Sequence, residues 1–453
     1  MTDDRRVPAP VRPPVALTVA GSDSGGGAGI QADLKTMEAH GAFGTSVLTA
    51  VTAQNTRGVE DTHVLPPDQV RAQYRAVIED FDVGAVKTGM LATRELIETV
   101  VDLFADYDGP VVVDPVMVAA SGDRLLTEEA EAAYDDLIAD AALVTPNADE
   151  AEVLTGRTLS DPADARAAGE DLVDLGADAA LMKGGHLGGD VVVDTLVTPG
   201  GVERFEHPRV DTDATHGSGD TLASAIAARL AAGASLRDAV AEGTAFMERA
   251  VRYGIDVGGG PGSVHHHVAL REEAARHPTI EAVEDLLGAF VDRDVGPLVP
   301  EVGTNVVGAT PYAERVEEVA AVEGRVARTM DGVAATRGVR MGASSHIARF
   351  LLAARERDPS LRFAANVRFD DAVEAALADA DLGGPAVAFD RADEPDDAAG
   401  TMDWSAGAAF AAAEGTPAAV YDRGDVGKEP MVRLLAPDAD ALRRRTFALL
   451  DAL

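Results

Sequence analysis

Short apolar runs alternate with amphipathic stretches through the first part of the chain. The apolar runs have the length of buried strands and lie at residues 15–20, 47–53, 85–87, 111–113, 142–144 and 179–182. Helical spacing of apolar positions separates most of them, as at residues 34–40, 67–80, 95–107 and 161–175. Strands that alternate with helices predict an α/β fold with a mostly parallel central sheet flanked by helices. Residues 191–197 and 201–205 then predict a hairpin.

A polar tip follows directly after each predicted strand. The amide, ammonium and carboxylate side chains at these tips are Gln54, Lys87, Asp114, Asn147, Glu150 and Lys183. Ligands of open α/β sheets bind outside the carboxyl ends of the strands. The sequence therefore predicts that these side chains converge on one rim of the sheet.

Asn147 and Glu150 lie three residues apart where a strand gives way to a helix, so both side chains fall on one face of the first turn. An amide and a carboxylate there suit Mg²⁺, which keeps several waters and bridges to phosphate. The alternative is a helix N-cap followed by an acidic first turn, and the pattern alone favours that alternative.

A glycine-rich turn at residues 216–220 leads into a predicted helix from Thr221 to about Ala232. Without side chains at Gly217 and Gly219, the backbone N–H groups around Ser218 can approach an oxyanion at the helix N-terminus. Asp220 beside that anion site suits a general base for an attacking hydroxyl. The alternative is that Ser218 or Asp220 only caps the helix.

The composition excludes several classes of function. The 453 residues include no cysteine, which excludes a disulfide frame, a thiolate metal site and a cysteine nucleophile. The net charge of −38 argues against binding to nucleic acid or to anionic lipid. The sequence contains no run of about 18 uncharged apolar residues, so it predicts no membrane span. We interpret the charged, proline-rich residues 1–14 as a disordered tail on a cytoplasmic protein.

So large a negative charge also bears on the solvent in which the protein works. In dilute buffer the surface would repel itself, whereas at molar salt the Debye length is only about 3 Å. The acidic surface and the scarcity of lysine therefore indicate a salt-loaded cytoplasm, such as that of extreme halophiles.

Lysine is rare in this chain, and three of the four lysines lie within two residues of a glycine. The four are Lys35, Lys87, Lys183 and Lys428. A compact ammonium beside a glycine turn suits the binding of a phosphate. The alternative is that these lysines remain in the chain by chance.

Ordered motifs in residues 15–268 resemble the hydroxymethylpyrimidine/phosphomethylpyrimidine kinases of thiamine synthesis, which are ribokinase-like. The matching blocks are residues 20–35, 54–59, 87–91, 114–117, 146–150, 182–186 and 260–266. The resemblance implies two successive ATP-dependent phosphorylations of one pyrimidine. One departure stands out, because the family usually has cysteine where this chain has Asp220, and aspartate is the pattern of the wider sugar-kinase superfamily.

The resemblance also implies a role for each candidate site residue. It places Lys183 on the nucleotide phosphates and Asp220 as the catalytic base. It gives Gly217, Ser218 and Gly219 as the anion hole, and Asn147, Glu150 and Asp114 as the Mg²⁺ ligands. The residues expected around the pyrimidine are Gly21, Ala28, Asp33, Gln54 and Met90.

Residues 298–453 are too long to extend the first core, so we expect a second, smaller α/β domain after a helical linker at 269–297. Arg325, Arg391 and Lys428 beside glycine turns suggest an anion pocket, and His346 could donate a proton to a leaving phosphate. Salt bridges to surface carboxylates and a capped helix start are the alternatives.

Residues 279–453 resemble the archaeal-type thiamine-phosphate synthase domain that is often fused behind the pyrimidine kinase. The similar blocks are Pro-Glu-Val-Gly, Gly-Ala-Ser-Ser-His, Asp-Arg-Ala-Asp-Glu-Pro and Gly-Lys-Glu-Pro. The resemblance implies coupling of hydroxymethylpyrimidine diphosphate to a thiazole phosphate, with Arg325 and His346 as catalytic groups and Arg391 and Lys428 on phosphate. The expected partners are these small molecules and further copies of the chain, in a homo-oligomer whose number of subunits does not follow from the sequence.

Two other functions remain open at this stage. Asp220 also permits a kinase for another small alcohol, such as pyridoxal or a sugar. The second half could instead be a non-catalytic domain that senses thiamine phosphate, although the chain has no basic recognition helix of the kind DNA-binding regulators carry.

Overall fold

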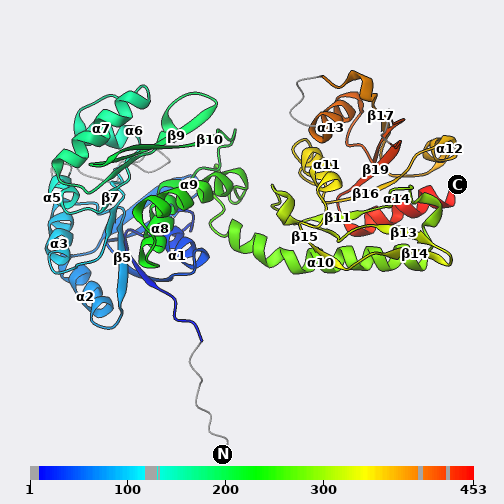
Figure 1. The fold of residues 1–453 in the computed structure, drawn as a ribbon. Coiled ribbons are helices and arrows are strands. Elements are labelled where there is room, and N and C mark those ends of the chain that lie inside the picture. The colour runs from blue at the N-terminus through cyan, green and yellow to red at the C-terminus, as the bar shows by residue number, and fades with distance from the viewer. Residues whose placement is uncertain (1–9, 118–129, 131–132, 396–400, 425–428) are drawn as a thin grey trace, which may run out of the picture. The chain divides into compact units, whose positions relative to one another are not determined.

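Two separate sheets divide the chain into two units, residues 1–269 and 270–453. The computed structural model describes residues 10–117, 130, 133–395, 401–424 and 429–453 (Figure 1). Within these ranges, no helix has the length and apolar character needed to cross a bilayer.

The first unit is built on an eight-stranded sheet with the order β10-β9-β8-β7-β6-β5-β1-β2. Six neighbouring strands run parallel to one another, namely β8, β7, β6, β5, β1 and β2. Strands β9 and β10 complete the sheet as an antiparallel hairpin. Their bounds are β1 (Val15–Ala20), β2 (Phe43–Leu48), β5 (Val83–Thr88), β6 (Val111–Val113), β7 (Leu143–Val144), β8 (Ala180–Met182), β9 (Val191–Thr198) and β10 (Gly201–Pro208). The predicted mostly parallel sheet is confirmed.

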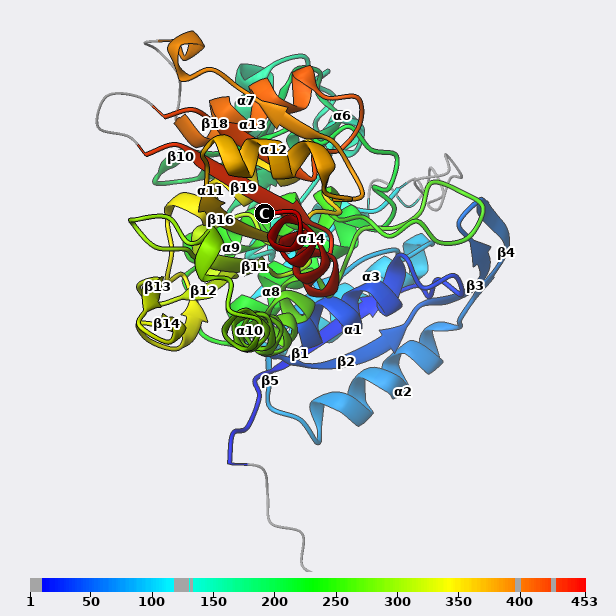
Figure 2. The same ribbon diagram turned by 90° about the vertical axis from the view of Figure 1, so that its right-hand side faces the viewer.

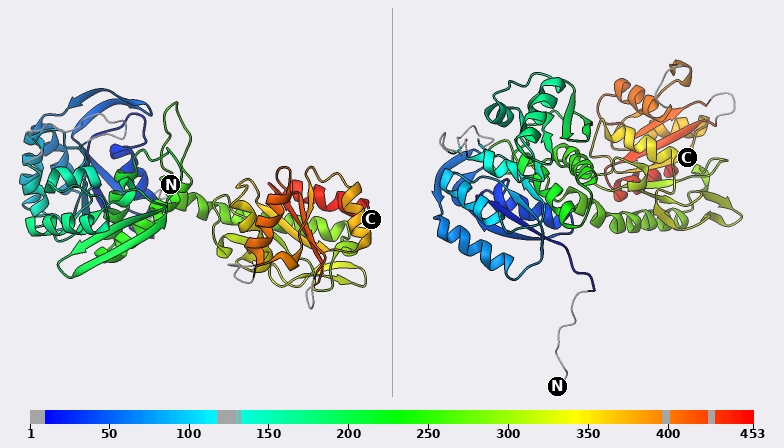
Figure 3. Two further views of the ribbon diagram at one scale, coloured as in Figure 1. Left: turned by 90° about the horizontal axis from the view of Figure 1, so that it is seen from above. Right: turned by 60° about the vertical axis from the view of Figure 1, so that its left-hand side comes forward.

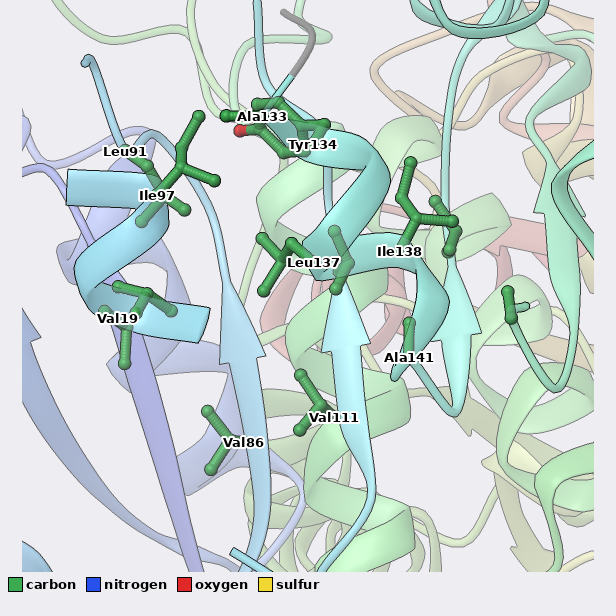
Figure 4. Close-up of a cluster of buried hydrophobic side chains, with 14 of the residues drawn as sticks. Val19, Val86, Leu91, Ile97, Val111, Ala133, Tyr134, Leu137, Ile138 and Ala141 are labelled. Carbon is green, nitrogen blue, oxygen red and sulfur yellow. The ribbon is translucent and has the colours of Figure 1, made fainter. Parts of the chain in front are cut away.

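Helices cover both faces of this sheet. One face carries α1 (Gly29–Ala39), α8 (Ser218–Ala231) and α9 (Leu236–Arg252). The other carries α2 (Pro67–Ile78), α3 (Arg94–Phe104), α5 (Tyr134–Ala139), α6 (Ala148–Thr155) and α7 (Pro162–Leu175). Figure 2 shows the layering at one edge, where α1 and α2 lie on opposite sides of β1 and β2. Ile97, Tyr134 and Ile138 of the covering helices belong to the same buried apolar cluster as Val86 and Val111 of the strands (Figure 4).

The sequence pattern predicts one strand at 47–53, and this prediction is wrong, because the chain leaves the main sheet at Thr49. Thr49 donates its N–H to Ala20 O and its hydroxyl to Met90 O, which pins the turning point. The chain continues as β3 (Ala50–Asn55), which pairs with β4 (Gly58–Val64) in a separate two-stranded sheet. Helix α1 likewise starts at Gly29 rather than near residue 34, because Ile30 N donates to Gly21 O at the end of the glycine loop.

The second unit has a mainly antiparallel seven-stranded sheet with the order β15-β12-β11-β16-β19-β18-β17, in which β17 and β18 run parallel. The strands are β11 (Val306–Ala309), β12 (Val319–Val322), β15 (Val339–Met341), β16 (Phe363–Arg368), β17 (Ala386–Ala388), β18 (Ala419–Asp422) and β19 (Met431–Ala436), with the hairpin β13 (Val326–Thr329) and β14 (Gly332–Ala335) beside them. Further views show strands between helices in each unit (Figure 3).

Helices again cover two faces and bury two apolar clusters. One cluster includes residues of α10 (Val268–Asp292), α12 (Asp371–Asp379) and α14 (Ala439–Asp451). The other includes residues of α11 (His346–Arg355) and α13 (Thr401–Ala412). The expected α/β character of the second half is confirmed. The segment expected as a linker, 269–297, is mostly α10, and its Val283, Leu286 and Phe290 lie in the second core. Short 3-10 turns are η1 (Gly184–His186), η2 (Gly296–Leu298), η3 (Val316–Glu318) and η4 (Arg391–Asp393).

Candidate active sites

A cavity of about 670 Å³ opens at the carboxyl ends of the parallel strands in the first unit. Its volume lies within the usual range for a small-molecule site. The predicted residues that line it are Gly21, Ala28, Gln54, Met90, Asp114, Asn147, Glu150, Lys183, Gly217, Ser218, Gly219 and Asp220. The predicted rim therefore exists, except for Asp33 and Lys87, which do not line the cavity.

The N-terminus of α8 forms one wall of this cavity. Gly217 has a φ of 78°, and a Cβ there would lie 1.9 Å from Gly27 O, so the position requires glycine. No side chain of the described residues caps this helix, so the simple capping alternative is not what the fold uses. The first turn instead presents backbone N–H groups and the positive end of the helix dipole to the cavity, which favours an anion.

Asp220 stands in that first turn with both carboxylate oxygens engaged. Oδ1 lies 2.9 Å from Lys87 Nζ, and Oδ2 accepts a hydrogen bond of 3.2 Å from Gly29 N. Burial alone would raise the pKa of Asp220, but Lys87, the Gly29 hydrogen bond and Lys183 together outweigh burial and lower that pKa. The carboxylate is therefore ionised at neutral pH and can accept a proton.

Lys87 and Asp33 lie behind Asp220, where neither can reach a substrate. The Lys87 side chain is fully buried, and its Nζ lies 2.9 Å from Asp33 Oδ1. Asp33 also accepts hydroxyl hydrogen bonds from Thr18 (2.6 Å) and Ser224 (2.7 Å). This corrects two expectations, since Asp33 does not surround a substrate and Lys87 contacts carboxylates rather than phosphate. Burial, only partly offset by Lys87, raises the pKa of Asp33 to about 6.

A second ion pair crosses the cavity floor. Lys183 Nζ lies 2.9 Å from Asp114 Oδ1 and 3.6 Å from Glu150 Oε2. Burial would lower the pKa of Lys183, but these two carboxylates outweigh burial and raise it. Burial, reinforced by Asp114 and opposed by Lys183, raises the pKa of Glu150 to about 7.

The metal expectation for Asn147 needs revision, because Asn147 forms a reciprocal capping box with Glu150. Glu150 N donates to Asn147 Oδ1 (2.9 Å), and Asn147 N donates to Glu150 Oε2 (2.8 Å). The amide of Asn147 thus serves helix α6, as in the capping alternative.

Asp114 is the stronger metal candidate. Its Oδ2 is buried and has no hydrogen-bond partner among the described residues, although Thr145 and Lys183 both donate to Oδ1. Those residues hold no cluster of three or more histidines or carboxylates that would cage an ion. Mg²⁺ is commonly bound by one or two carboxylates together with substrate phosphates, so Asp114 and Glu150 fit this ion.

Asp23 and His216 also line this cavity, although neither residue was assigned a role from the sequence. The Asp23 carboxylate accepts backbone hydrogen bonds from Gly25, Gly27 and Ala28, and His216 Nε2 lies 3.2 Å from Asp23 Oδ2. Asp23 thereby shapes the glycine loop and ties it to the turn before α8. An aspartate just before a glycine run is a signal for such a loop.

The second unit has its own cavity, of about 730 Å³, lined by three of the residues predicted there. Arg325, His346 and Arg391 face the same space as Arg349 and Arg433. Lys428, the fourth, lies outside the described residues. Within the described part of the chain, neither Arg325 nor Arg349 forms an ion pair, which leaves two guanidinium groups for an anion.

Arg391 is held more firmly than expected. Asp422, fully buried, accepts two hydrogen bonds from Arg391 (2.6 and 3.0 Å) and one from Arg433 (3.1 Å). Arg433 also lies over the rings of Phe350 and Phe389. Burial lowers the pKa of Arg433, against the opposing effect of Asp422. The salt-bridge alternative is therefore realised for Arg391, but inside the cavity wall rather than on the surface.

His346 is the first residue of α11, and its Nδ1 lies 3.3 Å from Ser345 Oγ. No side chain in the described ranges caps this helix at Ser345, so the capped-start alternative is not formed. The imidazole and the guanidinium of Arg325 share the cavity, which suits a leaving anion.

Comparisons with known proteins agree with this division. A family model described as phosphomethylpyrimidine kinase matches residues 23–265, and one described as thiamine-phosphate synthase ThiN matches residues 282–446. A hydroxymethylpyrimidine/phosphomethylpyrimidine kinase of Streptomyces coelicolor is 52% identical over 265 residues, which cover 58% of this chain and 98% of that protein. The thiamine biosynthesis bifunctional protein ThiED of Geobacter sulfurreducens is 48% identical over 271 residues, 59% of this chain and 55% of that protein.

A solved structure similar to the first unit is that of a Bacillus subtilis pyridoxal kinase in an ADP complex. It is 33% identical, has a TM-score of 0.53, and the match covers 57% of this chain and 99% of that one. A Staphylococcus aureus pyridoxal kinase with AMP-PCP and pyridoxal gives 31% identity and a TM-score of 0.54, covering 58% of this chain and 96% of that one.

Proposed function

The chain belongs to the phosphomethylpyrimidine kinase family, and from that premise we propose that it carries out consecutive reactions of thiamine biosynthesis. The first unit uses ATP to phosphorylate 4-amino-5-hydroxymethyl-2-methylpyrimidine and then its phosphate. The second unit couples the resulting diphosphate with a thiazole phosphate to give thiamine phosphate and diphosphate. The observation that carries the kinase assignment is one cavity that holds an ionised Asp220, a charged Lys183 and the open N-terminus of α8.

Phosphoryl transfer depends mainly on placement and charge stabilisation. We assign the N–H groups at Gly217–Gly219 to the oxygens of the transferred phosphoryl group, and Lys183 to the charge on the nucleotide phosphates. Asp220 takes the proton of the hydroxymethyl group as its oxygen attacks the γ-phosphorus and ADP leaves.

The pyrimidine has its own expected wall. Gly21, Ala28, Gln54 and Met90 line the same cavity, and a Cβ at Gly21 would lie 2.3 Å from the Met90 methyl carbon. The absent side chain at Gly21 thus gives Met90 the room to lie against a flat ring.

Asp114 and Glu150 are the residues we propose for Mg²⁺. Their support is the unpartnered Oδ2 of Asp114 beside the Glu150 carboxylate. When bound, the ion would neutralise charge on the nucleotide phosphates.

For the synthase, the coupling requires the diphosphate to depart from the pyrimidine methylene carbon while the thiazole nitrogen bonds to that carbon. We assign Arg325 and His346 to the departing diphosphate and Arg391 to a phosphate, because all three residues line this cavity. Four guanidinium groups in one cavity of so acidic a protein support this use.

Pyridoxal is the second candidate substrate, because the similar solved structures named above are pyridoxal kinases. ADP formation measured separately with hydroxymethylpyrimidine and with pyridoxal distinguishes the two. A kcat/KM higher for hydroxymethylpyrimidine supports the proposal, and the reverse ranking replaces it. Supplying hydroxymethylpyrimidine diphosphate and thiazole phosphate tests the second unit, because binding without thiamine phosphate formation would indicate a sensor.

We also propose that the protein works as a homo-oligomer in the cytoplasm of a salt-loaded, haloarchaeal cell. The net charge of −38 and the small number of lysines support the salt-loaded cell, and the oligomeric state is a proposal for measurement. Light scattering in molar KCl measures the oligomeric state under those conditions.

A further inference from the structure

A buried lysine separates two carboxylates at the edge of the kinase cavity. Lys87 Nζ lies 2.9 Å from Asp33 Oδ1 on one side and 2.9 Å from Asp220 Oδ1 on the other. Of these three residues, only Asp220 lines the cavity. Lys87 is thus the charge that stands directly behind the group facing the substrate.

The two proposed phosphorylations place different demands on Asp220. In the first, the nucleophile is an alcohol, whose proton must leave. In the second, the nucleophile is an oxygen of a phosphate monoester, which carries about −1.5 to −2 charges at pH 7. A base has no proton to remove in that step, and an uncompensated carboxylate would repel the incoming substrate.

Resting on the proposed function, we infer that Lys87 is a positioning residue and counter-ion that lets one cavity accept both a neutral and an anionic substrate, and that only the first transfer requires Asp220 as base. In the first transfer, the hydroxyl proton passes to the Asp220 carboxylate. The new O–P bond forms at the γ-phosphorus, and the bond to the β–γ bridging oxygen breaks, so that ADP departs with the electron pair. In the second, an already ionised phosphate oxygen makes the O–P bond, ADP departs in the same way, and no proton moves to Asp220.

The surroundings fix Lys87 in this position. Asp33 is itself anchored by the hydroxyls of Thr18 and Ser224. A Cβ at Gly89 would lie 2.9 Å from Lys87 Nζ, so the glycine leaves the space that the ammonium occupies. Burial opposes the charge on Lys87, but Asp220 and Asp33 outweigh burial and raise its pKa, so the counter-ion stays charged.

Charge balance follows from these contacts. Two carboxylates and one ammonium leave a single negative charge, and in this enclosed site charges interact more strongly than in water. Replacing Lys87 with a neutral residue leaves both carboxylates uncompensated, so the net charge behind the phosphorylated substrate changes from −1 to −2. The phosphorylated substrate should then lose affinity more than the neutral one.

The test measures each transfer separately in the full-length protein, with hydroxymethylpyrimidine or its phosphate as the acceptor and ADP as the readout. Asp220→Asn should lower kcat of the first transfer by about a hundredfold or more, the usual effect of losing a general base. Its kcat for the second transfer should fall by less than about tenfold, because that step uses no base. Equal losses in both transfers would overturn the inference.

Lys87→Met provides the second arm. It should raise KM for the phosphorylated acceptor at least about tenfold more than KM for the neutral acceptor, and Lys87→Met/Asp220→Asn should reverse that excess by removing the repelling charge. A KM change equal for both acceptors would contradict the counter-ion role. If Lys87→Met does not fold, the Asp220→Asn ratio decides the inference. A wild-type protein that phosphorylates neither acceptor would instead refute the proposed function.

Discussion

Lys183 Nζ lies 2.9 Å from Asp114 Oδ1, although 69 residues separate the two in the sequence. Each follows a strand of the parallel sheet, and the carboxyl ends of those strands bring them together. The pair fixes the ammonium at the cavity floor before any nucleotide arrives. The cavity therefore contains a fixed positive charge, and each of its residues can be tested separately.

Removing the Lys183 ammonium should damage nucleotide use. We expect Lys183→Met to lower kcat/KM for ATP by about a hundredfold or more, the scale for loss of one charge-stabilising donor in an active site. Steady-state kinetics with varied ATP measures this. Lys183→Arg is the matched control because it keeps the charge and should retain more of the activity. Wild-type values in Lys183→Met would remove this residue from phosphate binding.

The turn before α8 depends on a missing side chain. Gly217→Ala should lower both stability and kinase activity, because its Cβ would overlap Gly27 O at 1.9 Å. Gly233→Ala is the matched control, since it has a φ of 83° and nothing lies within 4 Å of its Cβ position. The control should lose only the roughly 1–2 kcal/mol cost of a left-handed alanine and keep its activity. Thermal unfolding and ATP turnover of both variants measure the difference. Equal effects would show that Gly217 needs only its backbone conformation.

Glu150 gives a pH-dependent prediction for stability. Its pKa is raised from 4.5 to about 7, so the folded protein favours the protonated form, and its stabilising contribution is lost as pH rises from about 4.5 to 7. Glu150→Gln imitates the protonated form and can keep the capping box. The free energy of unfolding of the variant relative to wild type should increase by up to about 3 kcal/mol between pH 4.5 and pH 8. Urea unfolding at the two pH values measures this difference, and a pH-independent difference would contradict the raised pKa.

The second cavity can be disabled without touching the first. Asp422→Asn removes the buried charge that holds Arg391 and Arg433, and breaking a buried pair typically costs about 3–5 kcal/mol. Synthase activity should fall by at least about tenfold, while ADP formation by the kinase stays at the wild-type rate. Kinase activity is the internal control for folding of the first unit. Unchanged synthase activity would show that the guanidinium groups need no fixed orientation.

Salt should stabilise the folded protein. With a net charge of −38, self-repulsion is strong in dilute buffer and largely screened where the Debye length is about 3 Å. We expect Tm and kinase activity to rise together as KCl increases from millimolar to molar concentrations. Circular dichroism and ADP formation along one salt series measure this. Full structure and activity in dilute buffer would contradict the halophilic interpretation.

The sequence predicted the cavity rim because short apolar runs, each followed by polar residues, locate the carboxyl ends of the parallel strands. The sequence could not predict which of the polar side chains are buried behind the cavity, and its predictions for two of them were wrong. Asp33 and Lys87 look like rim residues in the sequence, yet their pairing with each other buries both, and residues 54 apart give no sign of such a contact. Asn147 and Glu150 show the opposite case, since local spacing alone favoured the capping box that the structure contains.

The second unit was harder to predict because its pairings are mostly antiparallel and distant. Arg325 was identified beside a glycine turn, and Arg391 in the Asp-Arg-Ala-Asp-Glu-Pro block. The partner of Arg391, Asp422, lies 31 residues away on β18 and carries no motif of its own. Its role follows only from three-dimensional contact, as does that of Arg433 on the neighbouring strand β19.

The most direct test of the whole account follows one reaction mixture from hydroxymethylpyrimidine, ATP and thiazole phosphate in molar KCl. We expect two molecules of ADP and one of inorganic diphosphate for each thiamine phosphate formed by the single purified chain. ADP formation without thiamine phosphate, or a ratio of one ADP per thiamine phosphate, would contradict it.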